Sequence, residues 1–122
     1  MMKVGIDLVE NSRIDQILKA KERIFLTSEL EYINKFTQKN EHYCAIFCAK
    51  EAVFKTLDMP KINFLEIEIL HNQNNRPYVR FYGKTANHFD ENFKEIDISV
   101  SHTAVQTTAI AIATEKGKIS LL

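Results

Sequence analysis

Glycine is scarce in this chain, whose 122 residues include only three, at Gly5, Gly83 and Gly117. The dinucleotide-binding loop G-x-G-x-x-G and the Walker A loop both need glycines a few residues apart, so neither phosphate-binding loop is present. The chain also contains no H-E-x-x-H, C-x-x-C or G-x-S-x-G motif. Zincin metalloproteases, thioredoxin-type redox centres and the hydrolase nucleophile elbow are therefore excluded, and any chemistry must come from scattered side chains.

An excess of charge and a long apolar run are also missing. The 16 Lys and Arg residues balance 16 Asp and Glu residues, so no overall basic field attracts nucleic acid or an anionic membrane, and we predict neither as a partner. Acidic residues interrupt the segment 1–10 where a signal peptide would be apolar, and no apolar run approaches a membrane span. We expect one globular domain over residues 1–122, located in the cytoplasm.

Only two cysteines occur, Cys44 and Cys48, four residues apart in a helical pattern. This spacing does not suggest a disulfide framework, and a reducing compartment fits it. His42 lies close by in the sequence, but two thiols without a second pair of ligands make a poor zinc site. We interpret both cysteines as small buried hydrophobic residues.

The hydrophobic pattern predicts the element order βαααββαββ, and its short antiparallel connections indicate an α+β fold. At the start, Val4, Ile6 and Leu8 alternate with Gly5, Asp7 and Val9, which predicts a buried strand of about six residues. Helices follow over 12–21, from a Ser12-x-x-Asp15 capping box, over 27–36, with Thr27 or Ser28 as cap, and over 41–57. The remaining elements are half-exposed strands over 65–69 and 77–82, a helix over 85–93, and strands over 96–101 and 107–114.

The segment 41–57 is apolar on nearly all sides of a helical wheel, so we expect a long helix inside the protein. Its charged residues, Lys50, Glu51 and Lys55, then need an explanation. Glu51 and Lys55 are four residues apart and could form an ordinary intrahelical ion pair. They also share one narrow stripe between apolar faces, which is typical of the wall of a polar site.

Asp7 is the polar exception in the first strand, where an isolated buried carboxylate would be costly unless it is paired, hydrogen-bonded or bound to a metal. A structural salt bridge or exposure at the edge of a sheet is one interpretation. Alternatively, Asp7 and Glu51 are carboxylates from different elements and suit Mg²⁺, with Lys55 beside them to neutralise phosphate charge. His102, which follows Ser99-x-Ser101, is a turn residue, a phosphate donor or half of a nucleophile pair, although no third triad member is apparent.

Three segments together resemble the 4′-phosphopantetheinyl transferases. They are Gly5-Ile6-Asp7, the central block F-C-A-K-E-A-V-F-K at 47–55, and S-V-S-H-T at 99–103. Any one of these alone would be a weak signal. The length, Leu26-Thr27-x-Glu29, I-E-I at 67–69 and Arg76-Pro77 resemble more narrowly the holo-acyl-carrier-protein synthase branch of this family, with a small antiparallel sheet packed around a long buried helix.

This resemblance implies an enzyme that transfers 4′-phosphopantetheine from coenzyme A to a serine of apo acyl carrier protein in fatty acid biosynthesis, releasing adenosine 3′,5′-bisphosphate. Asp7 and Glu51 would bind Mg²⁺. Glu51 and Lys55 would be catalytic, since Glu51 helps to remove the proton of the carrier serine and Lys55 neutralises the pyrophosphate. The resemblance also implies a homotrimer with active sites between subunits.

The resemblance further implies two sets of contact residues. The coenzyme A contacts would be Lys50, Lys55, Pro77, Ser101 and His102. Carrier proteins of this type are acidic, and the docking residues would be Arg13, Ile14, Ile17 and Arg23, with Lys21 as a further member of the basic patch. The chain departs from the family at Ile46, where a basic residue is common, at 57–61, where a glycine-rich loop is common, and in a short segment between Arg23 and Leu26.

Two other functions remain open from the residues alone. One is a different Mg²⁺-dependent phosphoryl-transfer or nucleotide enzyme that uses the same carboxylates and lysine. The other is a non-catalytic binding module in which Asp7, Glu51 and Lys55 form a structural ion-pair network.

Overall fold

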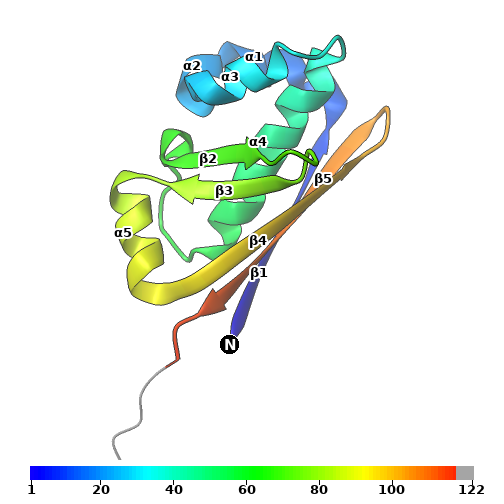
Figure 1. Ribbon diagram of the computed structural model, residues 1–122. Helices are drawn as coiled ribbons and strands as arrows, with labels where there is room; N and C mark the ends of the chain where they lie inside the picture. The colour runs from blue at the N-terminus through cyan, green and yellow to red at the C-terminus, as the bar shows by residue number, and fades with distance from the viewer. Residues whose placement is uncertain (118–122) are drawn as a thin grey trace, which may run out of the picture.

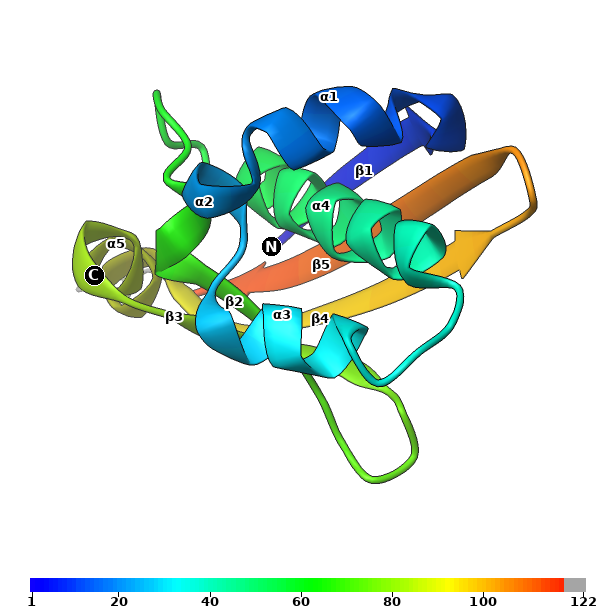
Figure 2. The same cartoon turned by 90° about the horizontal axis from the view of Figure 1, so that it is seen from above.

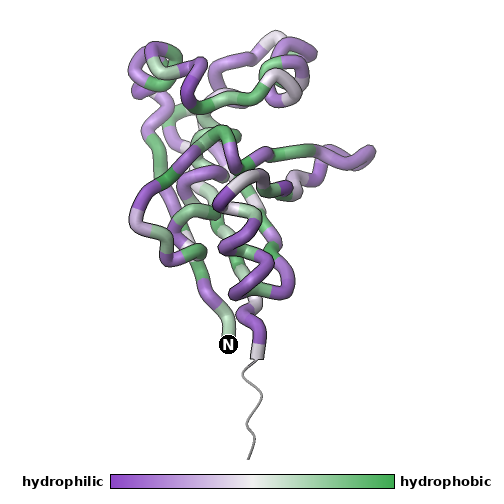
Figure 3. Tube along the Cα trace, turned by 90° about the vertical axis from the view of Figure 1, so that its left-hand side faces the viewer, coloured by the Kyte–Doolittle hydropathy of each residue, from purple (hydrophilic) through white to green (hydrophobic). Residues whose placement is uncertain are grey.

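A computed structural model describes residues 1–117 as two antiparallel sheets that wrap around one long helix (Figure 1). The larger sheet has the strand order β1-β5-β4, and the smaller sheet pairs β2 with β3. The strands are β1 (Met2–Glu10), β2 (Ile67–His71), β3 (Pro77–Phe81), β4 (Phe93–His102) and β5 (Gln106–Glu115). The turn between β2 and β3, residues 72–76, projects from the body as a hydrophilic segment (Figures 2 and 3).

The long helix α4 lies on the three-stranded sheet, with α1 on one flank and α3 on the other (Figure 2). The helices are α1 (Ile14–Lys19), α2 (Lys21–Ile24), α3 (Thr27–Ile33), α4 (Lys39–Thr56) and α5 (Gly83–Asn92), with short 3₁₀ turns η1 (Asn11–Arg13) and η2 (Phe64–Glu66). None of the helices within residues 1–117 is both long and apolar enough to cross a membrane. The α+β class and the buried central helix are therefore confirmed.

The core is formed mainly by α4 and the strands and helices packed around it. Cys44, Cys48, Ala49, Ala52 and Val53 of this helix are all fully buried. Both cysteines are free thiols, so their interpretation as small buried residues is confirmed. A helix buried on so many sides can keep a charged residue only where that residue finds a partner or reaches an opening.

The prediction of a buried first strand is wrong. Strand β1 is nine residues long and pairs only with β5, so it is an edge strand. Val4, Ile6 and Leu8 are 59%, 62% and 60% exposed, whereas Gly5 and Val9 on the opposite face are buried against α4. Apolar residues on both faces of a strand indicate that both faces are shielded from water. They do not show whether residues of the same chain cover both faces.

Several local details also differ from the predictions. Ser12 is not a helix cap, because it lies in η1 and the residue before α1 is Arg13, whose side chain makes no capping bond. Where one helix is predicted over 12–21, α1 ends before Ala20, and a second helix, α2, continues beyond the predicted end to Ile24. Leu26, rather than Thr27 or Ser28, precedes α3, and its backbone N–H donates to the Glu29 carboxylate at 2.8 Å.

Glu68 in β2 is buried, although the alternating pattern predicts an exposed side chain. Its carboxylate accepts hydrogen bonds of 2.5 Å from Ser28 and from Tyr82, and these bonds tie β2 to α3 and to the end of β3. Leu65 belongs to η2 rather than to the strand, and its side chain is 37% exposed. Tertiary hydrogen bonds thus override the local alternation here.

Gly5 is the point of closest approach between β1 and α4. A Cβ atom at this position would overlap the backbone carbonyl oxygen of Ala52 and would lie 3.0 Å from side-chain carbons of Lys55 and Thr56. Glycine is needed here for the close contact between the two backbones. Asp7 lies two residues further along the same face of β1, so its side chain also points toward α4.

We expect Gly5→Ala to destabilise the fold by about 3 kcal/mol, because the added methyl group must push a backbone carbonyl away. The free energy of unfolding in urea, followed by circular dichroism, measures this effect. Gly117→Ala is the matched control, since a Cβ there meets nothing within 4 Å. Equal unfolding midpoints for the two variants would show that the contact between β1 and α4 is not tight.

Candidate active site

An ion pair joins β1 to the last turn of α4. The Lys55 Nζ atom lies 3.0 Å from Asp7 Oδ1 and donates a second hydrogen bond of 2.9 Å to the carbonyl oxygen of Ile6. The Asp7 side chain is only 15% exposed, whereas that of Lys55 is 49% exposed. Asp7 is therefore held in place by a cation that is itself partly exposed to solvent.

Glu51 lies one helical turn before Lys55 on α4 and is half-buried. Burial raises the pKa of its carboxyl group, and the negative charge of Asp7 raises the pKa further, whereas Lys55 and Arg13 act in the opposite direction. The two carboxyl groups are thus close enough to repel each other. Within residues 1–117, Lys55 forms its ion pair with Asp7 and none with Glu51, so the simple intrahelical pair predicted as an alternative is absent.

The donor set of Asp7 and Glu51 suits a hard cation. Burial and the charges of both carboxylates raise the pKa of the adjacent Cys48 thiol to about 12, so this thiol is protonated at neutral pH. No group of three or more His, Cys, Asp or Glu side chains in the described part of the chain is arranged to hold a metal ion. Two carboxylates are nevertheless what Mg²⁺ commonly takes from a protein, because it keeps waters and phosphate oxygens as its other ligands.

Lys50, the residue next to Glu51, points the opposite way and is fully buried. Its ammonium group donates to Glu29 Oε1 at 2.6 Å, to the carbonyl oxygen of Ile24 at 2.5 Å and to that of Phe64 at 3.0 Å. An ammonium group has three hydrogens, and all three are used. The structure therefore corrects the assignment of Lys50, because this side chain cannot contact coenzyme A.

The expected docking residues divide into exposed and buried members. Arg13 and Arg23 are exposed, and Lys21 is exposed beside Arg23 on α2. Ile17 is only 3% exposed and belongs to the core, so its assignment to a docking surface is wrong; Ile14 is half-buried and packs against the same core. In a short amphipathic helix, the apolar face packs against the core of its own chain and is then not available to a partner protein.

Pro77, Ser101 and His102 lie away from Asp7, Glu51 and Lys55 in this chain. Ser101 is exposed near the end of β4 and pairs with Thr108 of β5, which also pairs with Leu8. Two strand spacings, about 10 Å, therefore separate Ser101 from β1. Pro77 and His102 both line a cleft of about 240 Å³ beside the start of α4.

This cleft contains a cluster of aromatic rings that the sequence does not reveal. His71 stacks on Tyr32 with ring centroids 3.8 Å apart, and His42 stacks on Phe36 at the same separation. The Nδ1 atom of His71 is buried and has no hydrogen-bond partner within residues 1–117. Burial lowers the pKa of His71 to about 4, and the nearby His42 contributes. The residues come from α3, the segment that follows it, α4 and β2, so no sequence spacing signals their contact.

The folded-state pKa of His71 lies below its ordinary value of 6.5, so the unfolded chain binds this proton more readily. Stability is therefore lost as the pH falls from 6.5 toward 4. We expect His71→Phe, which keeps the stacked ring but does not titrate, to lose less of its unfolding free energy than the wild type over this interval. The melting temperature of each protein is measured across this pH interval. If both melting temperatures change by the same amount with pH, the assignment of this pKa is refuted.

Comparison with known proteins places the chain among enzymes of one kind. The family model described as the 4′-phosphopantetheinyl transferase superfamily matches residues 3–114. The holo-[acyl-carrier-protein] synthase of Caldanaerobacter subterraneus is 37% identical over 117 residues, which cover 90% of this chain and 92% of the relative. That of Caldicellulosiruptor bescii is 36% identical over 121 residues, which cover 93% and 98%.

Solved structures show the same fold. An ACPS–CoA complex of Chronobacterium ammoniagenes superposes with a TM-score of 0.84 at 24% identity, covering 96% of this chain and 99% of that one. The holo-[acyl-carrier-protein] synthase of Helicobacter pylori in complex with coenzyme A gives a TM-score of 0.72 at 27% identity, covering 93% and 99%.

Proposed function

The chain belongs to the 4′-phosphopantetheinyl transferase superfamily, and within it to the holo-[acyl-carrier-protein] synthase type; on this premise we propose that it transfers 4′-phosphopantetheine from coenzyme A to a serine of an apo acyl carrier protein. The serine oxygen forms a bond to the phosphorus on the pantetheine side of the pyrophosphate. The bond from that phosphorus to the bridging oxygen breaks, and adenosine 3′,5′-bisphosphate leaves. The cluster of Asp7, Glu51 and Lys55 is the observation that carries this proposal.

Each residue of the cluster has a role in this reaction. Asp7 and Glu51 would hold Mg²⁺, which neutralises charge on the pyrophosphate of coenzyme A. Lys55 supplies a fixed positive charge for the phosphate oxygens, since its ammonium group is half-exposed. Glu51 would accept the serine proton, directly or through a bound water, from its half-buried position on α4.

Intact-mass measurement of an apo carrier protein tests the proposal. Incubation with this protein, coenzyme A and Mg²⁺ should add the mass of one phosphopantetheine, and EDTA should prevent the addition. We expect Asp7→Asn and Glu51→Gln to lower the rate by about 100-fold or more, because each removes a charged group from the reacting centre. Glu91→Gln, an exposed acidic residue on α5, is the control for a lost surface charge.

Other results would favour the two alternatives. Mg²⁺-dependent turnover of ATP without any use of coenzyme A would point to a different phosphoryl-transfer enzyme. A stable protein with neither transfer nor metal affinity would point to a non-catalytic module. Wild-type rates in both Asp7→Asn and Glu51→Gln would refute the site assignment even if transfer occurs.

The same proposal includes a homotrimer with active sites between subunits. Its support is the exposed apolar face of β1, formed by Met2, Val4, Ile6 and Leu8 and continued on β5 by Ile110, which is 36% exposed. A contiguous apolar face of a sheet is typical of a protein interface. In such an assembly Ser101 and His102 would contact coenzyme A bound mainly by a neighbouring subunit, which fits their distance from Asp7 in one chain.

We expect Ile6→Asp to convert the trimer to monomers and to abolish transfer, because a carboxylate in the centre of an apolar interface would be desolvated without a partner. Sedimentation equilibrium measures the mass of both proteins. Val105→Asp is the control, since Val105 is a 67% exposed apolar residue in the turn between β4 and β5. A monomeric wild-type protein with full activity would overturn the trimer proposal.

The remaining coenzyme A contacts, Lys55, Pro77, Ser101 and His102, stay part of the proposal. So do a role in fatty acid biosynthesis and a cytoplasmic location.

The loop that replaces the family's glycine-rich segment turns at Asp58, whose φ of 56° lies in the left-handed region that favours glycine. Aspartate tolerates this conformation better than most residues, so the loop can turn here without glycine.

A further inference from the structure

Lys50 is a buried charged residue that the proposed reaction does not use. It belongs to the central block F-C-A-K-E-A-V-F-K and stands directly before Glu51, yet its side chain is fully buried and points away from the candidate site. Burying a charge is costly, and an apolar residue of the same size would often give an equally stable fold. The conspicuous charge at this position therefore points to a role beyond stability.

Glu29 gives the Lys50 ammonium group a fixed partner. Its Oε1 atom accepts from Lys50 at 2.6 Å and from Leu26 N at 2.8 Å, and its Oε2 atom accepts from Ile69 N at 2.8 Å. Glu29 is fully buried, so these bonds are shielded from water. Two motifs that are distant in the sequence thus meet in one bond, which connects α4 to the start of α3 and to β2.

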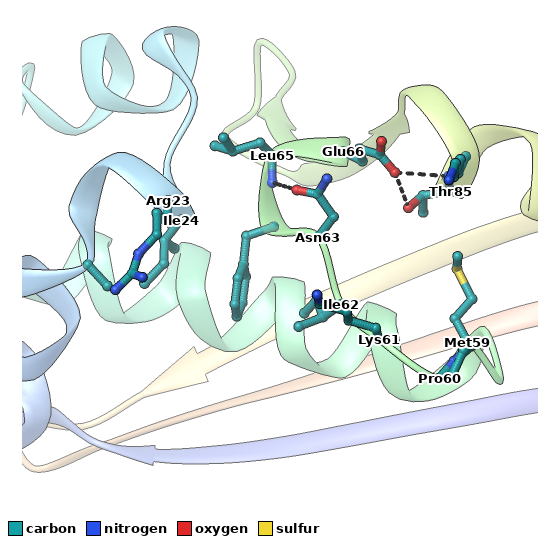
Figure 4. Close-up of a pocket in the computed structure, with 13 residues that line it drawn as sticks. Arg23, Ile24, Met59, Pro60, Lys61, Ile62, Asn63, Leu65, Glu66 and Thr85 are labelled. Atoms are coloured by element: carbon teal, nitrogen blue, oxygen red, sulfur yellow. Dashed lines mark hydrogen bonds between the residues drawn. The ribbon is translucent and has the colours of Figure 1, made fainter.

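The other two bonds of Lys50 reach the walls of a cavity of about 840 Å³ beside α2. Ile24, at the end of α2, and Phe64, at the start of η2, line this cavity together with the start of α5 (Figure 4). Their carbonyl oxygens accept from Lys50 at 2.5 and 3.0 Å. The exposed basic residues of the lining are Arg23, Lys61 and Lys84. Lys50 therefore holds two walls of the cavity from the buried side.

The remaining contacts of α4 give it little directional restraint. Much of its surface consists of small buried side chains such as Ala49 and Ala52, and apolar contacts are non-directional. Within residues 1–117, side chains of α4 form hydrogen bonds to other elements only at Cys48, Lys50 and Lys55. The Cys48 thiol is a weak donor, and Lys55 is half-exposed, so its bonds compete with water. The strong, buried and directional bonds are those of Lys50.

A small rotation of α4 about its axis would disturb the candidate site. Helix side chains extend about 5–6 Å from the axis, so a rotation of about 20° moves a carboxylate by about 2 Å. Mg²⁺ binds oxygen ligands at about 2.0–2.1 Å in nearly ideal octahedral geometry, and catalytic groups have to be held to within about 0.5 Å. Glu51 is the next residue of the same helix, so a rotation permitted at Lys50 also displaces Glu51.

We propose that Lys50 is a positioning residue for the transfer reaction. Its three buried hydrogen bonds fix the rotation of α4, so that Glu51 faces Asp7 at a spacing that suits one metal ion. An apolar residue of the same size would fill the same space but would leave this rotation to non-directional contacts. The inference rests on the proposed function and adds to it a residue that touches neither a substrate nor the metal ion.

A double variant of the full-length protein, Lys50→Met with Glu29→Gln, tests this inference. It removes both charges together, so no unpaired charge stays in the core. We expect the Mg²⁺ concentration for half-maximal transfer to rise about tenfold or more, and kcat to fall about tenfold or more. Titration calorimetry of Mg²⁺ into protein saturated with coenzyme A, without carrier, should show that the Kd for Mg²⁺ rises by a similar factor.

Glu68→Gln is the matched control for the loss of a buried charge. The Glu68 carboxylate is buried, and its hydrogen-bond donors, Ser28 and Tyr82, lie outside α4. We expect this variant to unfold at a lower urea concentration than the wild type, with its Mg²⁺ requirement and Kd changed less than about twofold. A loss of stability without a change in α4 is thereby separated from a displaced Glu51.

Lys50→Arg keeps the test decisive if the double variant shows no cooperative unfolding in urea. Arginine retains the positive charge, but its planar guanidinium group cannot present its hydrogens to the same three acceptors. We therefore expect the Mg²⁺ requirement to rise about threefold or more in this variant as well.

The outcomes distinguish this inference from the proposed function. If the wild type transfers phosphopantetheine and the folded double variant, or Lys50→Arg in its place, keeps the wild-type Mg²⁺ requirement, Lys50 is purely structural: the inference is overturned and the proposed function stands. If Glu68→Gln raises the Mg²⁺ requirement as much, any loss of stability has this effect and the inference is again overturned. If the wild type transfers nothing to several apo carriers, the proposed function fails and the inference fails with it.

Discussion

The direct contact between β1 and α4 at Gly5 is the constraint on which the candidate active site depends. A side chain at this position would collide with the backbone of Ala52, so the helix can lie on the strand only where a glycine stands. This contact brings the last turn of α4 beside Asp7, where Lys55 reaches the carboxylate at 3.0 Å. In the Gly5-Ile6-Asp7 motif, the glycine thus permits the close approach of α4 to β1. The aspartate then lies within reach of the lysine at the end of that helix.

A buried ion pair sets the second part of the arrangement. Lys50 and Glu29 are both fully buried, and their hydrogen bonds reach the end of α2, the start of α3, the turn η2 and strand β2. Burying two charges is costly unless nearly every donor and acceptor is satisfied, and this pair meets that condition. Two consecutive residues of α4 therefore have opposite roles: Lys50 holds neighbouring segments together from inside, whereas Glu51 faces the candidate site.

Two apolar surfaces stand out within residues 1–117. The outer face of β1 is apolar and exposed, and the cavity beside α2 is apolar with basic residues around it. The apolar surroundings of β1 are the reason that a second copy of the chain is proposed to cover this face.

The sequence by itself determined the α+β class, the burial of the central helix and the element order, apart from the division of the first helix into α1 and α2, because these depend on periodicities that extend over one element. It also singled out Asp7, Glu51 and Lys55, which lie together in the structure. Only the tertiary structure decided which face of β1 is covered, since alternation cannot say what lies opposite. It likewise decided that Lys50 and Ile17 point inward and that His71 stacks on Tyr32. Those outcomes depend on contacts between segments distant in the sequence. The residues of one segment do not indicate which residues of another segment pack against them.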